Sequence, residues 1–331
     1  MAKKRGSYSR SRSGKLQPAV MQMNFVIPSG VSYLDLPLAL SIANRRLYRQ
    51  ENTSYTVAGF ELLSGGNLGT LIVDKLPETW VYDNAYQKTR ALWHKMNDQV
   101  LDDEPSIKGR YTDFKILMES AQLGSIVQTQ SNPAGTTLTP AQSIGGVNQF
   151  TSADFTGAVS PRADWEYSQL TIPNDPVSGT STDYYITGVG PTTVGTKSAI
   201  EGYARSRSRP QSQDPNVPTN SGWMTELFDV GEQLEELRDI IENDNDRPPY
   251  PVSPEQTSND FYPGGGTEFP GLQTHGFCSF TSSTVSAKNV ISGGIFQNGL
   301  IRFTNSSDGT FTLLLHMVPG SHRGYLCEAM D

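Results

Sequence analysis

The sequence predicts an all-β protein, built from two packed antiparallel sheets with helices placed in the connections. Strand-like segments bounded by turn residues recur along the chain, and thirty-one Gly and twenty-one Pro indicate many turns. Two segments have strong helical patterns, and they interrupt the strands without alternating with them. Regular βαβ units are therefore not expected, and about eight to ten strands remain for the sheets.

The first strands are recognised by apolar runs that end at turn residues. Residues 20–27 read VMQMNFVI and precede a Pro-Ser-Gly turn, so a strand is expected there. Residues 33–50 fit two patterns, because alternating leucines favour a strand while the later part suits a helix. We expect extended backbone first and helix after it. Strands at 55–63 and 69–73 flank the sequence SGGN, which has the composition of a hairpin loop.

Two main helices are predicted in the connections. Thr79 can cap the first one with its hydroxyl, and the helical pattern continues from Trp80 to about Val100. The second is expected at about 222–243, where apolar residues trace one stripe of a strongly acidic segment. Both helices are insertions between strands.

Further strands and long polar loops make up the rest of the chain. The remaining strands are expected at 111–118, 165–172, 184–189, 276–284, 287–296, 300–304 and 311–318. Residues 305–309 have the composition of a turn between the last two strands. Polar residues, Gly and Pro dominate the segments of about 122–157 and 190–220, which predicts two long surface loops.

A basic arm precedes an acidic body. Residues 1–17 carry six Lys or Arg and no acid, whereas the whole chain has a formal net charge of -8. Removing those six cations leaves twenty Lys and Arg against thirty-four Asp and Glu, so residues 18–331 sum to about -14. The arm has too little apolar surface to offset the entropy of ordering. It is expected to be disordered, with residues 18–331 forming the folded domain.

A flexible, positively charged segment is suited to binding a polyanion, because each Lys or Arg can displace a counterion from a phosphate. The expected nucleic-acid-binding residues of the arm are Lys3, Lys4, Arg5, Tyr8, Arg10, Arg12 and Lys15. The tyrosine among them can stack on an unpaired base. A second basic group, in the loop at 190–220, consists of Arg205, Arg207 and Arg209. For this group, phosphate contact and a merely soluble loop remain equally open.

The motifs of common enzyme classes are missing from the sequence. It contains no G-x-S-x-G nucleophile elbow, no phosphate-binding P-loop and no dinucleotide fingerprint. The four histidines are scattered without the spacing of a zinc site: His94, His275, His316 and His322. We expect His316 to be a core or interface residue. His322, next to Arg323, is expected to be a turn residue, with contact to an anion as the alternative. The chain is therefore not predicted to be an enzyme.

A structural cation is the one cofactor that the acidic residues suggest. Asp244 and Asp246 stand in a segment similar to the start of a calcium loop, but the Gly at its sixth position and the terminal Glu are missing. Asp102 and Asp103 belong to a second cluster of oxygen ligands. Calcium is the cation that such ligands prefer, and an acidic segment without any ion is the plainer alternative.

Targeting and compartment signals are few. No run approaches eighteen apolar residues, so no membrane insertion is expected. Cys278 and Cys327 are too few for a disulfide framework and are expected to be reduced and buried. The run of Lys and Arg near the N-terminus would also suit a nuclear address.

Three segments carry a family resemblance. They are WVYDNAYQKTRALWHKMNDQVLDD at Trp80–Asp103, DNDRPPYPVSPEQTSNDFYPGG at Asp244–Gly265 and VPGSHRGYLCEAM at Val318–Met330. Together with the basic arm and the missing active site, they resemble capsid proteins of small circular Rep-encoding single-stranded DNA viruses. These segments have no known chemistry of their own, and the arm is shorter and less Arg-rich than is common in that family.

The resemblance implies a single jelly roll of eight core strands in two sheets, assembled into an icosahedral shell with the arm inside. The implied partners are further copies of the chain and a single-stranded DNA genome, besides a host receptor that the sequence does not identify. The implied location is the virion, with the host nucleus as a second location during assembly. Repulsion between acidic subunits makes calcium at their interfaces a reasonable hypothesis.

Two other interpretations stay open. A β-sandwich surface protein, an adhesin or spike, would recognise a receptor or glycan through its long loops, but it has no use for a phosphate-seeking arm. A jelly-roll enzyme of the cupin type would need clustered His and Glu ligands, which the spacing of the histidines does not provide.

Overall fold

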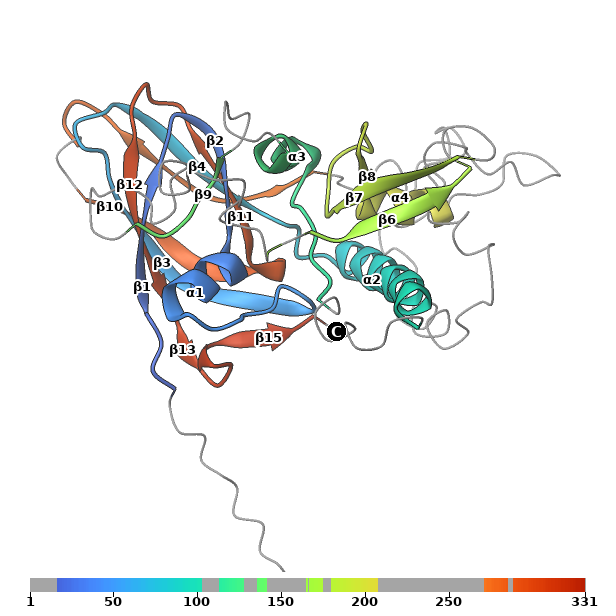
Figure 1. Cartoon of the computed structure of the whole chain (residues 1–331). Coiled ribbons are helices and arrows are strands. Elements are labelled where there is room, and N and C mark those ends of the chain that lie inside the picture. Colours follow the sequence, from blue (N-terminus) through green and yellow to red (C-terminus); the bar gives the residue numbers. More distant parts are fainter. Residues whose placement is uncertain are drawn as a thin grey trace, which may run out of the picture.

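Two curled β-sheets packed face to face form the body of the molecule (Figure 1). The computed structural model describes residues 17–102, 113–127, 136–141, 165, 167–174, 180–207, 271–284 and 288–330. The eight strands of the body are β1 (Gln22–Ile27), β2 (Gly30–Asp35), β3 (Thr53–Leu63), β4 (Gly69–Lys75), β9 (Gln273–Phe280), β10 (Asn289–Phe296), β11 (Leu300–Asn305) and β12 (Phe311–Met317).

The strand order identifies a jelly roll. One sheet has the order β1-β12-β3-β10 and the other contains β2-β11-β4-β9, with antiparallel pairing throughout. Counted along the chain as eight strands, the sheets run 1-8-3-6 and 2-7-4-5. Every connection except that from β4 to β9 crosses between the sheets, which is the double Greek-key pattern of a jelly roll. The predicted all-β architecture is therefore confirmed.

Alternate side chains of the strands fill the space between the two sheets. In β12, every second residue from Phe311 to Met317 is buried, while the residues between them are partly exposed. Phe60 of β3 packs edge-on against Phe296 and Phe303, at ring-centroid distances of 5.7 and 6.1 Å. A period of two places such side chains on one face of a strand, and truncating one of them to Ala costs about 3 to 5 kcal/mol.

Four short strands extend the two main sheets or lie beside them. β15 (Cys327–Ala329) pairs with the beginning of β3, and β5 (Thr136–Thr137) pairs in parallel with β2. β13 (Pro319–Gly320) and β14 (Gly324–Tyr325) form a small hairpin after β12. The C-terminal segment is thereby held along the body.

One long insertion, residues 76–272, separates the paired strands β4 and β9. Besides β5, its described elements are α2 (Trp80–Leu101), α3 (Ser120–Val127), β6 (Gln169–Pro173), β7 (Ser181–Thr187), β8 (Thr196–Ser198) and α4 (Ala199–Arg207). The insertion lies beside the sheet that contains β2 and β11 (Figure 1). On that face, Tyr33 and Leu300 join a second core with Tyr82 of α2 and Tyr203 of α4. One core therefore lies inside the jelly roll, and another fastens the insertion to it.

Polar side chains set the starts of two helices. α1 (Leu36–Asn44) follows β2 directly, and Oδ1 of Asp35 accepts a hydrogen bond from the Leu38 N–H at 3.2 Å. The hydroxyl of Thr79 accepts in the same way from the Tyr82 N–H at 3.4 Å. Each cap satisfies a backbone donor that the first helical turn leaves free. The predicted order of strand and helix after residue 30 and the predicted start of α2 are both confirmed.

Parts of the two predicted surface loops are helical and buried. Gln122, expected in the loop at about 122–157, lies in α3 and is fully buried. In the segment at about 190–220, α4 buries Ile200 and Tyr203. The loop prediction is wrong for these residues, because short helices in a polar stretch are stabilised by tertiary packing that composition does not reveal.

Two strand predictions also need correction. Within residues 113–118 the backbone forms no strand, and Leu117 makes an isolated bridge to Thr187. The predicted turn after β3 exists, since the Asn67 N–H donates to the Ser64 carbonyl at 3.1 Å, but β3 and β4 belong to different sheets. They form no hairpin because each strand packs into the shared core from its own sheet. The helix expected at about 222–243 lies outside the described residues.

Candidate functional site

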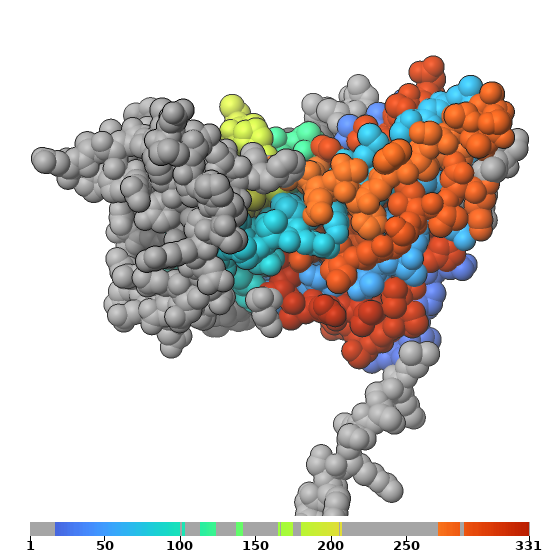
Figure 2. All heavy atoms as spheres, turned by 180° about the vertical axis from the view of Figure 1, so that it is seen from behind, coloured from blue at the N-terminus to red at the C-terminus, as the bar shows by residue number. Residues whose placement is uncertain are grey.

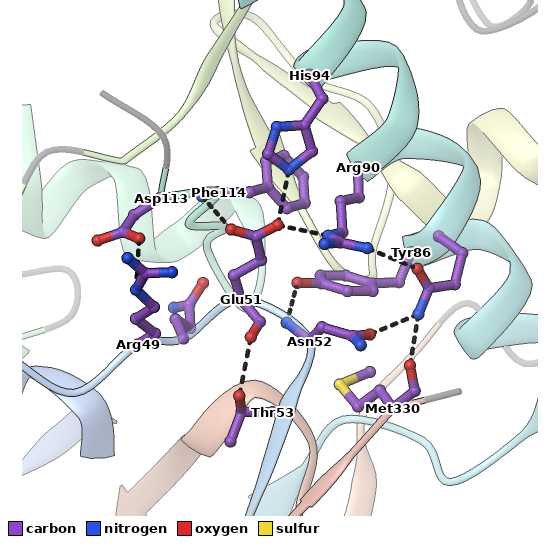
Figure 3. A network of polar contacts seen from close by, with 12 residues as sticks. Arg49, Glu51, Asn52, Thr53, Tyr86, Arg90, His94, Asp113, Phe114 and Met330 are labelled. Atoms are coloured by element: carbon purple, nitrogen blue, oxygen red, sulfur yellow. Dashed lines mark hydrogen bonds and ion pairs between the residues drawn. The ribbon is translucent and has the colours of Figure 1, made fainter. Parts of the chain in front are cut away.

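The first candidate is a cluster of charged side chains between the insertion and the jelly roll (Figure 3). Glu51 lies in the segment that joins α1 to β3. Its Oε1 is 2.6 Å from Nε of Arg90 and 2.7 Å from Nε2 of His94. Its Oε2 accepts a hydrogen bond from the Phe114 N–H at 3.3 Å. Arg90 and His94 are four residues apart on α2, so they reach Glu51 from the same helix face.

These contacts keep Glu51 ionised. Its side chain is 10% exposed, and burial by itself would raise its pKa. Hydrogen bonds from His94 and Arg90 outweigh burial and lower the pKa to about 2. A carboxylate with so low a pKa and three donors is a poor proton acceptor near neutral pH. The pair of Glu51 and His94 therefore fits a structural ion pair better than a catalytic dyad.

Further hydrogen bonds connect this cluster to the C-terminal segment. The Asn52 N–H donates to Oη of Tyr86 at 2.9 Å. Nε2 of Gln87 donates to Oδ1 of Asn52 at 2.6 Å and to the carbonyl of Met330 at 2.5 Å. The segment before β3 is thus tied to α2 and to the residue that follows β15 (Figure 3).

The second candidate is the buried carboxylate of Asp35. Besides the Leu38 N–H, it accepts hydrogen bonds from Nε1 of Trp165 and Oη of Tyr167, each at 3.0 Å, and from Nε2 of Gln50 at 3.4 Å. Burial raises the pKa of Asp35 to about 6, while the bonds from Leu38, Tyr167 and Trp165 oppose that rise. Because Trp165 and Tyr167 belong to the insertion, Asp35 forms a second attachment between the insertion and the body.

The third candidate is centred on Arg302 of β11, on the sheet face that adjoins the insertion. Its guanidinium binds Asp74 of β4 through Nε at 3.1 Å and Nη2 at 2.9 Å, and it binds Glu119 through Nη1 at 2.9 Å. The Tyr33 hydroxyl also donates to Glu119. Charge-assisted, forked contacts of this kind fix geometry strongly. Glu119 belongs to the insertion, so this group too joins the two parts of the molecule.

All three groups serve attachment, and a reaction centre is not assembled among them. Among the described residues, no group of three or more His, Cys, Asp or Glu could hold a metal ion. Asp102 is exposed at the C-terminal end of α2. Asp103, Asp244 and Asp246 lie outside the described residues. The calcium hypothesis stays a prediction.

The basic residues singled out in the sequence lie largely beyond the described ranges. Those of the arm, Lys3, Lys4, Arg5, Tyr8, Arg10, Arg12 and Lys15, all precede residue 17. Arg205 and Arg207 lie in α4 and not in a loop, which corrects the prediction, and Arg209 is outside the described residues. The helix forms there because Ile200 and Tyr203 pack into the second core. Nucleic-acid contact by these residues stays a prediction.

The predicted environments of His and Cys are partly correct. His316 is half-buried on the outer face of its sheet, with Nε2 3.5 Å from Glu61. It is therefore not a core residue, and the interface position that was the other half of the expectation stays a prediction. His322 lies in the turn of the β13–β14 hairpin, as predicted. Cys278 and Cys327 are free but half-buried, not fully buried. Burial raises their pKa to about 11 and about 12, which keeps both thiols protonated and unreactive near neutral pH.

Sequence reasoning missed a group of arginines beside residues 17–20. Arg45 and Arg46 follow α1, and Arg323 lies in the β13–β14 turn. All three are exposed. Nη1 of Arg46 donates to Oε1 of Gln17 at 2.5 Å. The pair Arg45-Arg46 after a helical pattern was a weak local signal, whereas the position of Arg323 depends on the tertiary structure.

No protein-family model, no curated protein and no solved structure matches the chain. No helix in the described part of the chain is long and apolar enough to span a membrane. The strand order, the exposed surfaces and the distribution of charge are therefore the basis for any functional argument.

Proposed function

We propose that the chain is the capsid subunit of a small single-stranded DNA virus, which self-assembles into an icosahedral shell and packages its genome through residues 1–17. The observation that carries the proposal is the jelly-roll strand order together with a basic N-terminal arm. Jelly rolls are the architecture of many viral capsid subunits. Six cations in so short a segment suit a phosphate backbone.

Exposed apolar side chains on the neighbouring end strands β9 and β10 support self-assembly. β9 ends one sheet and β10 ends the other, and neither has a second strand neighbour among the described residues. Phe277 of β9 is 70% exposed and Val290 of β10 is 61% exposed. Figure 2 shows these orange strands at the surface. β9 and β10 contact each other through His275, whose Nε2 lies 2.9 Å from the Ser292 carbonyl, and the exposed apolar side chains beside this contact suit burial by another copy.

The separation of charge supports packaging by the arm. The body carries a net charge of about -14 and repels a phosphate backbone as a whole. Contact with a genome must therefore be concentrated on basic segments. The arm is the most basic of these segments. We therefore assign nucleic-acid binding to the arm and assembly to the body.

The alternative is a β-sandwich surface protein that recognises a receptor or glycan, because jelly rolls also occur in lectins. The two proposals differ in oligomeric state. A capsid subunit forms closed particles at sufficient concentration, whereas a surface protein of this kind stays monomeric or forms a small oligomer.

Electron microscopy and light scattering of the expressed full-length protein test the proposal. We expect uniform closed particles. A monodisperse monomer across a range of salt and pH would exclude a capsid subunit, and glycan or receptor binding by that monomer would favour the alternative. Deleting residues 1–17 should leave particles intact but lower the nucleic acid that survives nuclease treatment. Equal nucleic-acid content in the truncated particles would exclude the arm as the packaging element.

A further inference from the structure

Residues 17–20 are fastened to the body at one place. The Val20 N–H donates to Oδ1 of Asn44 at 2.9 Å, and Nδ2 of Asn44 donates to Oη of Tyr325 at 2.8 Å. The Tyr325 hydroxyl in turn donates to the Val20 carbonyl at 2.6 Å. A Cβ on Gly324 would lie 2.6 Å from Cβ of Ala19, so the chain passes in close contact with the β13–β14 hairpin. This closed triangle fixes where the N-terminal arm joins the body.

Three exposed arginines belong to the segments that hold this point: Arg45 and Arg46 follow Asn44 directly, and Arg323 precedes Gly324. We call them the arm-root arginines. Nη1 of Arg46 contacts Gln17, as described above, and Nη1 of Arg323 donates to the Leu47 carbonyl. Burial raises the pKa of Tyr48, and the charges of Arg46 and Arg323 both oppose that rise. Two segments far apart in the sequence therefore place their cations around the same ring.

Glu51, the acid closest to Arg45 and Arg46 in the sequence, has other partners, and so does the neighbouring Arg49. Glu51 is held by Arg90 and His94, and Asp113 lies 3.1 Å from Arg49. Glu328 of β15 is the nearest acid to Arg323 in the sequence, and it is exposed. Three exposed arginines therefore stand where the arm joins a body that is acidic as a whole.

We propose that the arm-root arginines form a phosphate-binding surface on the folded body, continuous with the arm, that binds single-stranded nucleic acid. The choice of nucleic acid as the polyanion rests on the proposed function. Lys15 precedes Gln17 by two residues, which span at most about 7 Å, so one strand can contact the arm and then the body. Guanidinium groups bind phosphate through two parallel hydrogen bonds, which gives this surface geometry as well as charge.

Fluorescence anisotropy with labelled oligothymidylate tests this surface on the full-length protein. Binding is measured over a series of salt concentrations, with light scattering confirming that the protein is unassembled. The variant Arg45→Gln/Arg46→Gln/Arg323→Gln should lower the slope of log affinity against log salt by about 2, because each contact to a single strand contributes about 0.7. Weaker binding should follow at low salt.

Two control variants separate charge from damage to the fold. Arg45→Lys/Arg46→Lys/Arg323→Lys keeps the charges and should keep most of the slope. Lys95→Gln/Lys288→Gln removes two cations elsewhere on the body and should leave the slope unchanged. A triple Gln variant with the same slope as the unmodified protein overturns the proposal, and so does an equal loss in the Lys95→Gln/Lys288→Gln control.

The same measurement with anionic phospholipid vesicles distinguishes a membrane surface. Tighter, arginine-dependent binding to vesicles than to oligothymidylate would overturn the assignment to nucleic acid.

Failure of this surface proposal is distinguishable from failure of the proposed function. If electron microscopy shows particles but the triple Gln variant has an unchanged salt slope, the capsid proposal stands and the phosphate-binding surface is rejected. If the protein stays monomeric but the slope falls as expected, the surface stands and the capsid proposal is rejected.

Discussion

Glu51 and His94 join the body to its insertion through a contact of 2.7 Å, although 43 residues separate them in the sequence. Arg90 binds the same carboxylate oxygen from the same helix. The carboxylate is ionised over most of the accessible pH range, since its pKa is about 2. The attachment of the insertion therefore depends on a charge that only strong acid removes.

Replacing Glu51 with Gln should destabilise the protein by about 2 kcal/mol at pH 7, because the change leaves the Arg90 guanidinium and the His94 ring without their carboxylate. The lowered pKa sets the pH dependence. The stabilisation is present above the ordinary value of 4.5 and is lost as pH falls toward 2. Urea unfolding at pH 7 and near pH 3 measures this.

The surface pair of Glu61 and Lys288, 3.0 Å apart, provides the matched control. Glu61→Gln should cost much less than Glu51→Gln at pH 7, because solvent screens an exposed pair. Equal losses in the two variants, or a loss in Glu51→Gln that stays constant to pH 3, would contradict the structural role given to Glu51.

Asp35 should give the opposite pH dependence. Burial raises its folded pKa to about 6, so its contribution to stability is full below the unfolded value of about 3.9 and declines as pH rises through 6. Asp35→Asn removes this titration and also weakens some accepted hydrogen bonds. We expect the variant to be less stable than the unmodified protein at pH 4, with the gap narrowing by about 2 kcal/mol by pH 7. A gap that is constant across this range in thermal unfolding would refute the assignment.

Phe277→Ser tests the exposed apolar surface of β9. The side chain is 70% exposed, so the stability of the monomer should change by no more than about 0.5 kcal/mol. Particle yield, measured by light scattering and electron microscopy, should fall severalfold if a second copy covers this residue. Val194 is 98% exposed on the insertion, and Val194→Ser is the matched control, which should assemble normally. Equal yields from both variants would remove β9 from the subunit contact.

Substitutions at two glycines allow the cost of steric crowding to be measured separately from the cost of backbone strain. Gly299 has φ +68°, and an added Cβ would lie 2.5 Å from Cδ of Pro37. Gly66 has φ +99°, with no atom within 4 Å of the added Cβ. Gly66→Ala should cost about 1 kcal/mol through strain alone, whereas Gly299→Ala should cost about 3 kcal/mol because it also displaces core atoms. Chemical denaturation of both variants provides the comparison, and equal costs would mean that the core near Pro37 yields easily.

Local patterns predicted the elements better than their partners. The apolar segment at 311–318 predicted the strand that is β12, and the hydroxyl of Thr79 predicted the start of α2. The loop after Leu63 correctly suggested a turn, yet the strands on either side of it pair in different sheets. Turn composition reports local backbone preference, whereas sheet partners are chosen by burial in a core made from the whole chain.

The attachment groups could not be predicted from the sequence in the same way. Asp35 meets Trp165 across 130 residues, and no spacing rule connects such positions. Arg46 and Arg323 approach the same ring only once β13 and β14 have formed their hairpin. The basic arm was visible because its signal is compositional, whereas its continuation on the body depends on tertiary structure.

The pairing of β4 with β9 also has a consequence for the order in which the strands fold. The hydrogen bond from Thr274 to Asp74 spans 200 residues, and closing so long a loop costs about 3 kcal/mol more than closing a hairpin of about five residues. Leu76 and Leu272, at the two ends of the insertion, both pack with the second core, so the folded insertion brings its own ends together. We expect β9 to join its sheet late in folding, and Phe277 with it. An unfinished chain then lacks the strand on which the proposed assembly depends, so under that proposal incompletely folded subunits would be excluded from a growing shell.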